Sequence, residues 1–329
     1  MSKIQLTILT DPSPTLKYKF KKIFILIKQL IKQRLWFLFF KDKKNIPVTP
    51  QYGGHFAVTR SIIEGLKQIN INFNYNPKNI KDIAETIYIP GGIESLKYGI
   101  RLKKYGFIKK IIAGPNIVVT PNELINICDY DYINLYLQPS DWVVNWWKNL
   151  QPNMPIKIES WCAGVNIDFW KPTCLNKNKN KILIYKKFVP ENLFSEIKNL
   201  LQENNFEIEI INYGSYTPSE YLEALNRNSY LIHLTESESQ GISLAEAWST
   251  NTPTFVWNPT ITMYNNIVIE NCSSAPYLSE KTGKYFRDIS ELKNIFLRWN
   301  PDNYEPRKWV LDNMSDKVCA KTLLSIINK

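Results

Sequence analysis

The chain has few of the residues that build metal centres and disulfide frameworks. It contains two histidines, and its five cysteines form no Cys-x-x-Cys pair and have no histidine at ligand spacing (Cys128, Cys162, Cys174, Cys272 and Cys319). A disulfide framework and a structural zinc site are therefore not expected, and a reducing, cytoplasmic compartment is the default expectation. The chain also lacks an uncharged run of 18 residues, and neither a membrane-spanning helix nor a cleavable signal peptide is expected.

Excess positive charge is confined to one part of the chain. The 329 residues include 41 Lys/Arg and 30 Asp/Glu, a formal net charge of +11. Residues 1–50 hold eleven basic and two acidic residues, a net of +9, which leaves +2 for everything after Pro50. A nucleic-acid-binding protein would spread its cations along a groove, and this clustering speaks against one. The hydrophobic content of 44% is typical of a globular protein, and the length allows two domains.

The basic segment covers residues 17–44. On a helical wheel its lysines share one side and its apolar side chains the other (Lys17, Lys21, Lys28 and Lys32 against Phe20, Ile23, Phe24, Ile27, Leu30, Ile31 and Phe37). This pattern is typical of a helix lying in a membrane interface, with its lysines toward anionic headgroups. An amphipathic helix packed on its own domain, with solvated lysines, explains the same pattern, and both interpretations stay open.

Short apolar runs alternate with helical patterns along the chain. Strands are predicted near residues 3–10, 72–75, 86–90, 108–113, 133–137, 156–161, 181–187, 206–213, 230–234 and 253–257. Strands that alternate with helices predict parallel sheets with right-handed crossovers. The polar stretch 173–181 predicts a boundary between an N-terminal half, 1–172, and a C-terminal half, 173–304. A last helical stretch, 305–329, is expected to pack back on the N-terminal half.

One loop between two of these strands carries the residues best suited to chemistry. Residues 235–248 read Thr-Glu-Ser-Glu-Ser-Gln-Gly-Ile-Ser-Leu-Ala-Glu-Ala-Trp, with Gly241 where a helix is predicted to begin. A loop that leaves the carboxyl end of a parallel strand and enters a helix is where phosphate-bearing ligands bind. Glu238 and Glu246 flank the glycine. Glu246 has a structural alternative, because Ser243 and Glu246 are spaced as a capping box that would only satisfy the helix's own N-terminus.

The span from Glu238 to Glu246 resembles the E-x7-E signature of retaining, nucleotide-sugar-dependent glycosyltransferases with the GT-B fold (glycosyltransferase family 4). Residues 163–172 resemble the "GVD-x-x-x-F-x-P" crossover segment of that family. Pro139-Ser140 resembles its P-S-x-x element, and Gly53-Gly54 fits its N-terminal Gly-Gly turn. The resemblance runs in order from about residue 51 to residue 328. It implies two Rossmann-like domains facing across a cleft, with acceptor bound by the first and nucleotide by the second.

The resemblance also implies roles for single residues. Glu246 would bind the ribose hydroxyls and Glu238 the donor sugar, while Lys186 and Lys187 would stabilise the leaving diphosphate. The second basic position of the family falls on Asn192. The remaining expected contacts are on the donor side (Gly53, Gly54, Gln240, Gly241, Ile242 and Ser243) and on the acceptor side (His55 and Asn116). No metal and no cofactor besides the nucleotide-sugar co-substrate are expected. His233 and the tryptophans at 142, 146 and 147 are expected in the core.

The chain departs from the family at one place. About 40 residues, including the basic segment 17–44, separate the first strand from the Gly-Gly turn. A membrane-resting helix there would suit a lipid-linked or membrane-surface acceptor and a peripheral location on the inner face of a membrane. Three alternatives stay open: a GT-B sugar-nucleotide epimerase, a non-catalytic relative that Asn192 would explain, and a basic nucleic-acid-binding protein.

Overall fold

The structure is a computed structural model, and it describes residues 5–11, 54–173, 177–298, 300 and 303–328, with only the backbone at 54 and 55. The predicted membrane segment 17–44 and Gly53 lie outside the described residues. The described chain forms two compact units. The first holds residues 5–11, Ile71–Tyr136 and Pro155–Lys157, and the second holds Gly54–Asn70, Leu137–Met154 and 158–328.

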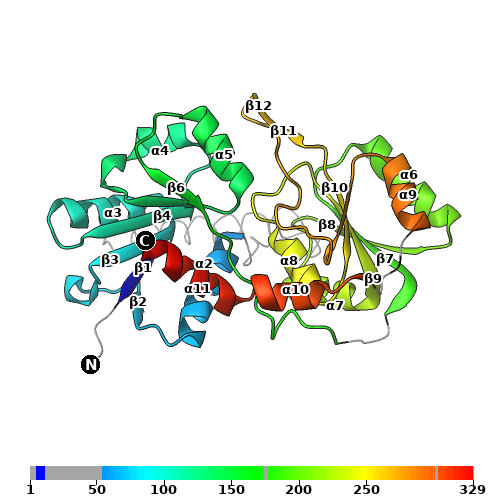
Figure 1. The fold of residues 1–329 in the computed structure, drawn as a ribbon, viewed down its shortest axis with the longest axis horizontal. Coiled ribbons are helices and arrows are strands. Elements are labelled where there is room, and N and C mark those ends of the chain that lie inside the picture. Colours follow the sequence, from blue (N-terminus) through cyan, green and yellow to red (C-terminus); the bar gives the residue numbers. More distant parts are fainter. Residues whose placement is uncertain (1–4, 12–53, 174–176, 299, 301–302, 329) are drawn as a thin grey trace, which may run out of the picture. The chain divides into compact units, whose positions relative to one another are not determined.

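The N-terminal strands form a six-stranded sheet in the order β2-β1-β3-β4-β5-β6 (Figure 1). Their bounds are β1 Leu6–Thr10, β2 Phe73–Tyr75, β3 Thr86–Gly91, β4 Lys110–Asn116, β5 Leu135–Gln138 and β6 Lys157–Ser160. The pairs from β2 through β5 run parallel. The connecting helices are α2 Gly54–Gln68, η1 Ile80–Asp82, α3 Ile93–Lys104, α4 Pro121–Ile127, η2 Tyr130–Tyr132 and α5 Asp141–Leu150. Central strands such as β3 are apolar on both faces, as parallel strands covered by helices must be.

The C-terminal strands form a second parallel sheet, in the order β13-β10-β9-β7-β8. Their bounds are β7 Asn178–Lys186, β8 Glu207–Asn212, β9 Asn228–Leu234, β10 Thr254–Trp257 and β13 Gly283–Phe286. The helices of this half are α6 Glu191–Glu203, α7 Pro218–Arg227, α8 Ile242–Ser249, α9 Ile289–Leu297, α10 Pro306–Asn313 and α11 Asp316–Ile327. The predicted alternation of strands and helices is confirmed, and the chain has the two-sheet Rossmann-like architecture expected for GT-B.

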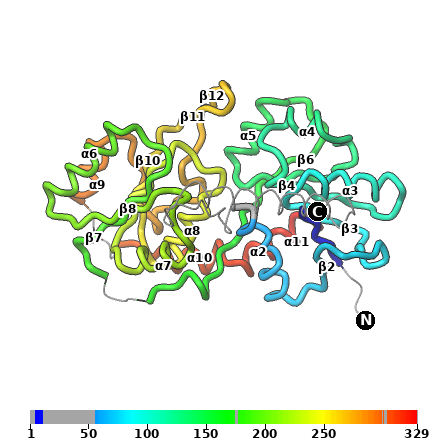
Figure 2. Tube along the Cα trace, turned by 180° about the vertical axis from the view of Figure 1, so that it is seen from behind, coloured from blue at the N-terminus to red at the C-terminus, as the bar shows by residue number. Residues whose placement is uncertain are grey.

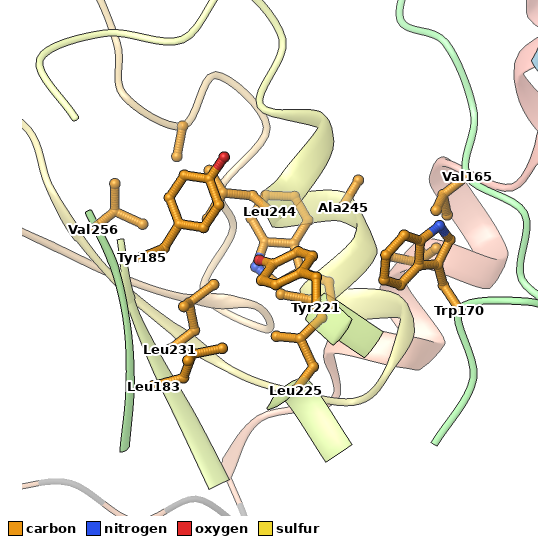
Figure 3. Packing of buried hydrophobic residues seen from close by; sticks show 14 of the residues in the cluster. Val165, Trp170, Leu183, Tyr185, Tyr221, Leu225, Leu231, Leu244, Ala245 and Val256 are labelled. Atoms are coloured by element: carbon orange, nitrogen blue, oxygen red, sulfur yellow. The ribbon is translucent and has the colours of Figure 1, made fainter. Parts of the chain in front are cut away.

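Strand periodicity divides the core of the second sheet between its two faces. Leu183 and Tyr185 of β7 pack with residues of α7 and α8, as Figure 3 shows. Ile182 and Ile184, the alternate residues, pack with residues of α6 and α9 on the opposite face. Each such fully buried aliphatic side chain contributes about 1.5–3 kcal/mol relative to an exposed one. The two layers hold β7 and β9 in register, with Lys186 opposite Leu234 where both strands end.

Three parts of the C-terminal half differ from the sequence-based expectation, and one of them is the edge strand β13, which was not predicted. An antiparallel hairpin, β11 Ile261–Tyr264 and β12 Ile267–Glu270, follows β10 and was not predicted. The last stretch forms two helices, α10 and α11, in place of one, and α11 lies beside α2 in both views (Figures 1 and 2). Gly65 of α2 leaves no room for a side chain, because a Cβ there would lie 2.3 Å from the Asp316 carbonyl oxygen. Among the helices that the structure describes, none combines the length and apolar character needed to cross a membrane.

Candidate active site

The loop between β9 and α8 ends in a helix N-terminus for which, among the residues that the structure describes, no side-chain cap is found. Gly241 is the N-cap residue in the left-handed conformation, with φ 80°, and α8 begins at Ile242. Glycine adopts this conformation without the steric cost that a Cβ imposes. The capping box considered for Ser243 and Glu246 is absent, because these residues occupy the second and fifth helical positions and Gly241 makes no side-chain cap bond. First-turn N–H groups and the helix dipole therefore favour an anion at this point.

Glu238 and Lys187 form an ion pair beside this helix start. Lys187 Nζ lies 2.8 Å from Glu238 Oε1, and both side chains are about 15% exposed (16% and 15%). The Lys187 ammonium also lies 4.6 Å from the centroid of the Tyr213 ring, a cation–π contact. Lys187 directly follows β7, and its N–H donates to the Leu234 carbonyl oxygen at 2.9 Å. The ends of β7 and β9 thus bring together two of the residues expected in the site.

Lys186 points elsewhere, because successive residues of a strand face opposite sides of the sheet. Its Nζ lies 2.7 Å from Glu191 Oε2 and 3.9 Å from the centroid of the Phe194 ring, both on α6. Asn192 is exposed in the first turn of the same helix. The structure therefore places Lys187 with Glu238, and it places Lys186 and Asn192 with α6.

Glu246 lies one turn inside α8 and is half-buried. Burial raises the pKa of Glu246 to about 8, and the nearby Arg60 guanidinium acts in the opposite direction. A carboxyl group with this pKa is largely protonated at neutral pH, so it can both donate and accept hydrogen bonds. Arg60 comes from α2, and sequence patterns alone gave no signal that it lies near this glutamate.

The start of α5 fixes the backbone of the loop. Ser140 Oγ donates to the Ser239 carbonyl oxygen at 2.6 Å, and Trp142 Nε1 donates to the Glu238 carbonyl oxygen at 3.0 Å. Ser140 is the N-cap residue of α5, yet its hydroxyl makes no cap bond to its own helix. Trp142 was expected in the core, and the structure shows that its indole instead holds the residue that pairs with Lys187.

Gln240 ties the loop to the crossover segment 163–172. Its side-chain Oε1 accepts from the Ala163 N–H at 3.0 Å, and its Nε2 donates to the Ala163 carbonyl oxygen at 2.7 Å. Gln240 is buried, so both ends of its amide are used by the protein's own backbone. Its expected donor contact can then come only through its main chain. Gly164, the next residue of the segment, passes so close to Asp316 that a Cβ would lie 2.6 Å from backbone atoms.

His233 lies beneath the helix start, within β9. It is fully buried, its ring stacks on Tyr185 with centroids 4.7 Å apart, and its Nε2 lies 3.2 Å from Ser243 Oγ. Burial lowers the pKa of His233 to about 3, and the charge of Lys187 acts in the same direction, so the ring is neutral. His233 is a core histidine as expected, but it is not fully satisfied, because its buried Nδ1 has no hydrogen-bond partner among the described residues.

The expected acceptor-side residues belong to other elements. Asn116 is half-buried at the end of β4, where it pairs with Gly91 of β3. Gly54 and His55 contribute the first backbone positions of α2. Within the part of the chain that the structure describes, no three metal-ligating side chains come together.

Solved structures provide the comparison for this arrangement. HepE from Anabaena, in complex with UDP and glucose, aligns over 99% of this chain and 100% of its own, with 9% identity and a TM-score of 0.52. TarM aligns over 74% of this chain with 13% identity and a TM-score of 0.51, and the match spans 55% of the TarM chain. No protein-family model and no curated protein matches the sequence. At these identities the comparison establishes the fold, which is that of GT-B glycosyltransferases.

Proposed function

We propose that this chain is a retaining glycosyltransferase that moves a hexose from a nucleotide-sugar donor to a carbohydrate or glycolipid acceptor. The observation that carries the proposal is the Lys187–Glu238 pair, 2.8 Å apart, beside the N-terminus of α8, where the N-cap residue Gly241 has no capping side chain. Such a place offers an anion the Lys187 ammonium, once it exchanges Glu238 for the anion, and a set of oriented N–H groups. The similarity to HepE, whose structure contains UDP and glucose, makes UDP the first nucleotide to test.

Departure of the diphosphate is the step that needs these groups. Negative charge develops on the leaving oxygen as the glycosidic bond breaks, and preorganised donors stabilise it most where water is excluded. Lys187 and the N–H groups of Gly241 and Ile242 are the donors that we assign to this charge. Glu238 holds Lys187 in place before the donor arrives. When the diphosphate takes over the ammonium, the Glu238 carboxylate turns to the hydroxyl groups of the donor sugar.

Glu246 is assigned to the ribose. Its position one turn inside α8 and its partial exposure leave the carboxyl group able to accept from two vicinal hydroxyl groups. Because Glu246 is bonded into no capping box, its hydrogen-bonding capacity remains open to a ligand. The proposed reaction uses Lys187 and helix α8 in the role that a divalent ion plays in metal-dependent transferases.

The acceptor is proposed to be lipid-linked or to lie at a membrane surface. Support comes from the sequence of residues 17–44, whose net positive charge and apolar face suit an anionic bilayer. Flotation with anionic liposomes tests this part separately, with the full chain compared against a deletion of residues 17–44. Equal flotation of the two proteins would remove the membrane role of that segment.

The site is tested by a thermal-shift panel of nucleoside diphosphates and UDP-sugars on wild type, Lys187→Met, Glu246→Ala and Lys186→Met. We expect UDP to stabilise the wild type, and we expect Lys187→Met and Glu246→Ala each to lose about tenfold or more in affinity. Lys186→Met is the matched control, since the neighbouring lysine faces α6, and its affinity should stay within about twofold of wild type. A panel in which no nucleotide stabilises the wild type would show that the loop is not a donor site.

Turnover is tested on the same proteins. Release of sugar from the donor into water, followed by NMR, gives both the rate and the anomeric configuration of the first product. We expect retention of configuration, and a loss of about 100-fold or more in rate for Lys187→Met, from the missing charge on the leaving group. Nucleotide binding without any donor hydrolysis would identify a non-catalytic relative, and product with inverted configuration would contradict the retaining mechanism.

A further inference from the structure

The C-terminus of α3 and the loop after it carry positive charge and exposed aromatic rings together. Residues 97–110 contain six Lys/Arg and no Asp/Glu (Lys97, Arg101, Lys103, Lys104, Lys109 and Lys110). At the tip, Tyr105 is 74% exposed and Phe107 is 55% exposed. Arg101, Lys104 and Lys109 around them are exposed as well.

The backbone of this tip is held rigidly without help from the aromatic side chains. The Gly106 N–H donates to the Lys103 carbonyl oxygen at 3.0 Å, and the Phe107 N–H donates to the Leu102 carbonyl oxygen at 2.9 Å. Together with Gly106 at φ 78°, these bonds form a Schellman motif at the end of α3. Leu102 and Ile108 on either side are buried and anchor the turn in the core of the first unit.

A Schellman motif usually buries the residue after the glycine against the last turn of the helix. Phe107 is the residue after the glycine here, yet more than half of its surface is exposed to solvent. A Cβ added at Gly106 would have no neighbouring atom of the described residues within 4 Å, so none of them packs over the turn at that point. The helix dipole accounts for cations near this helix end. It does not account for two exposed aromatic rings on a rigid turn among those cations, and folding gains little from them.

Two of these lysines have polar partners nearby. Lys109 Nζ lies 3.1 Å from Glu85 Oε2, and the Lys103 ammonium donates to the Tyr132 carbonyl oxygen and to Asn134 Oδ1. The other acidic groups near this end of the unit, Asp129 and Asp131, lie in and next to η2. Among the residues that the structure describes, the six basic side chains of 97–110 thus outnumber the three acidic ones, Glu85, Asp129 and Asp131, in this part of the unit.

The geometry points to the turn 101–109 as a docking surface for an anionic lipid bilayer. Tyr105 and Phe107 are suited to enter the headgroup region, because aromatic rings favour that depth, and Arg101, Lys104 and Lys109 are suited to contact anionic headgroups. This surface lies on α3 and its following turn, so it is distinct from the segment 17–44. It requires nothing of the proposed transferase reaction.

Co-sedimentation of the full chain with vesicles tests this surface, using phosphatidylcholine alone against phosphatidylcholine with about 30% phosphatidylglycerol. The variant Tyr105→Ser/Phe107→Ser should lower the bound fraction on anionic vesicles about fivefold or more, and Arg101→Glu/Lys104→Glu should lower it about tenfold or more. Leu297→Ser and Lys293→Glu/Arg298→Glu are the controls, since Leu297 of α9 is 83% exposed and its two basic neighbours are exposed as well. The controls should bind like wild type.

Hydrogen exchange on the unaltered protein gives a second measurement, which reports on the amides of the turn itself and not on those of the segment 17–44. Amides of residues 101–109 should exchange several-fold more slowly with anionic vesicles present, and not with phosphatidylcholine alone or with a single-stranded oligonucleotide. Wild-type binding that the loop variants leave unchanged would overturn the proposal. So would protection of this turn by the oligonucleotide and not by vesicles, because the partner would then be a nucleic acid.

Discussion

Glu246 shows how the surroundings of one residue change its chemistry. Burial raises the pKa of Glu246 to about 8, against about 4.3 for a glutamate in an unfolded chain. Between these two values the folded protein holds a proton that the unfolded chain has lost. The stability that this proton contributes is complete below pH 4 and is lost as pH rises through 8.

This shift predicts a pH-dependent effect of Glu246→Gln, whose amide resembles the protonated acid. Relative to wild type, the variant should gain about 2–4 kcal/mol of unfolding free energy as pH is raised from 5 to 8. Urea unfolding at several pH values measures it. Glu196→Gln, at an exposed position of α6, is the control and should show no such trend. A difference between Glu246→Gln and wild type that stays constant over this range would contradict the raised pKa.

Residue-level prediction from the sequence succeeded where a residue type and its spacing determine the local structure. Gly241 was placed at the start of a helix, and the structure has it there as the N-cap. The capping box failed because Gly241 starts the helix two residues before Ser243, so the serine could not occupy the cap. The contact of Trp142 with the Glu238 carbonyl oxygen joins residues 96 positions apart, and no local pattern encodes it.

The turn that enters α8 depends on Gly241 in two ways, through its backbone conformation and through the space beside it. Gly241 has φ 80°, and a Cβ there would meet Leu244 Cδ1 at 3.1 Å, which is tighter than an ordinary contact. Gly214 has nearly the same φ, 79°, with no atom within 4 Å of its Cβ position. The two glycines therefore share the backbone cost of substitution and differ in the packing cost.

We predict that Gly241→Ala lowers the unfolding free energy by about 2–3 kcal/mol, and Gly214→Ala by about 1 kcal/mol. Urea unfolding of both variants at one pH measures the difference. Nucleotide affinity should fall for Gly241→Ala alone, because its N–H belongs to the helix start. Equal losses in the two variants would mean that the close contact with Leu244 relaxes without cost.

Elements were predicted well where they are long and apolar, and the short strands β11, β12 and β13 were missed. The strands of the β11–β12 hairpin are four residues long each and bury few of their side chains, but the turn carries a usable signal. Asn265 and Asn266 both have positive φ, 46° and 65°, which a two-residue type I′ turn requires and asparagine tolerates. The basic segment 17–44 lies outside the described residues, so its helical prediction stays a prediction.

The contact of α2 with α11 links distant parts of the sequence within the second unit. Arg60 Nη1 lies 2.6 Å from Asp316 Oδ2, and Nη2 lies 3.1 Å from Oδ1, while the Asp316 side chain is 2% exposed. The same guanidinium donates to the Gly164 carbonyl oxygen at 3.2 Å. One arginine thus joins three segments of the chain.

Breaking this pair should be costly for the whole unit. Asp316→Ala leaves the Arg60 charge partly buried without its carboxylate, and we predict a loss of about 3–5 kcal/mol of unfolding free energy. Glu64→Ala removes the exposed pair with Lys67 on the same helix and should cost about 0.5 kcal/mol or less. Calorimetry of both variants measures the contrast. Similar melting temperatures for the two would show that the Arg60–Asp316 pair contributes no more than a surface pair.

The distance between α2 and α11 along the chain has a consequence for biosynthesis. Arg60 and Asp316 are separated by 256 positions, and at about 5–20 residues per second a ribosome needs some tens of seconds to make the second after the first. During that interval the face of α2 that α11 covers has no native partner. Nascent chains stalled before residue 316 should therefore be cut by protease within α2. Released chains that contain all of α11 should resist cleavage there. Protection of α2 in the stalled chains would show that α11 is dispensable for it.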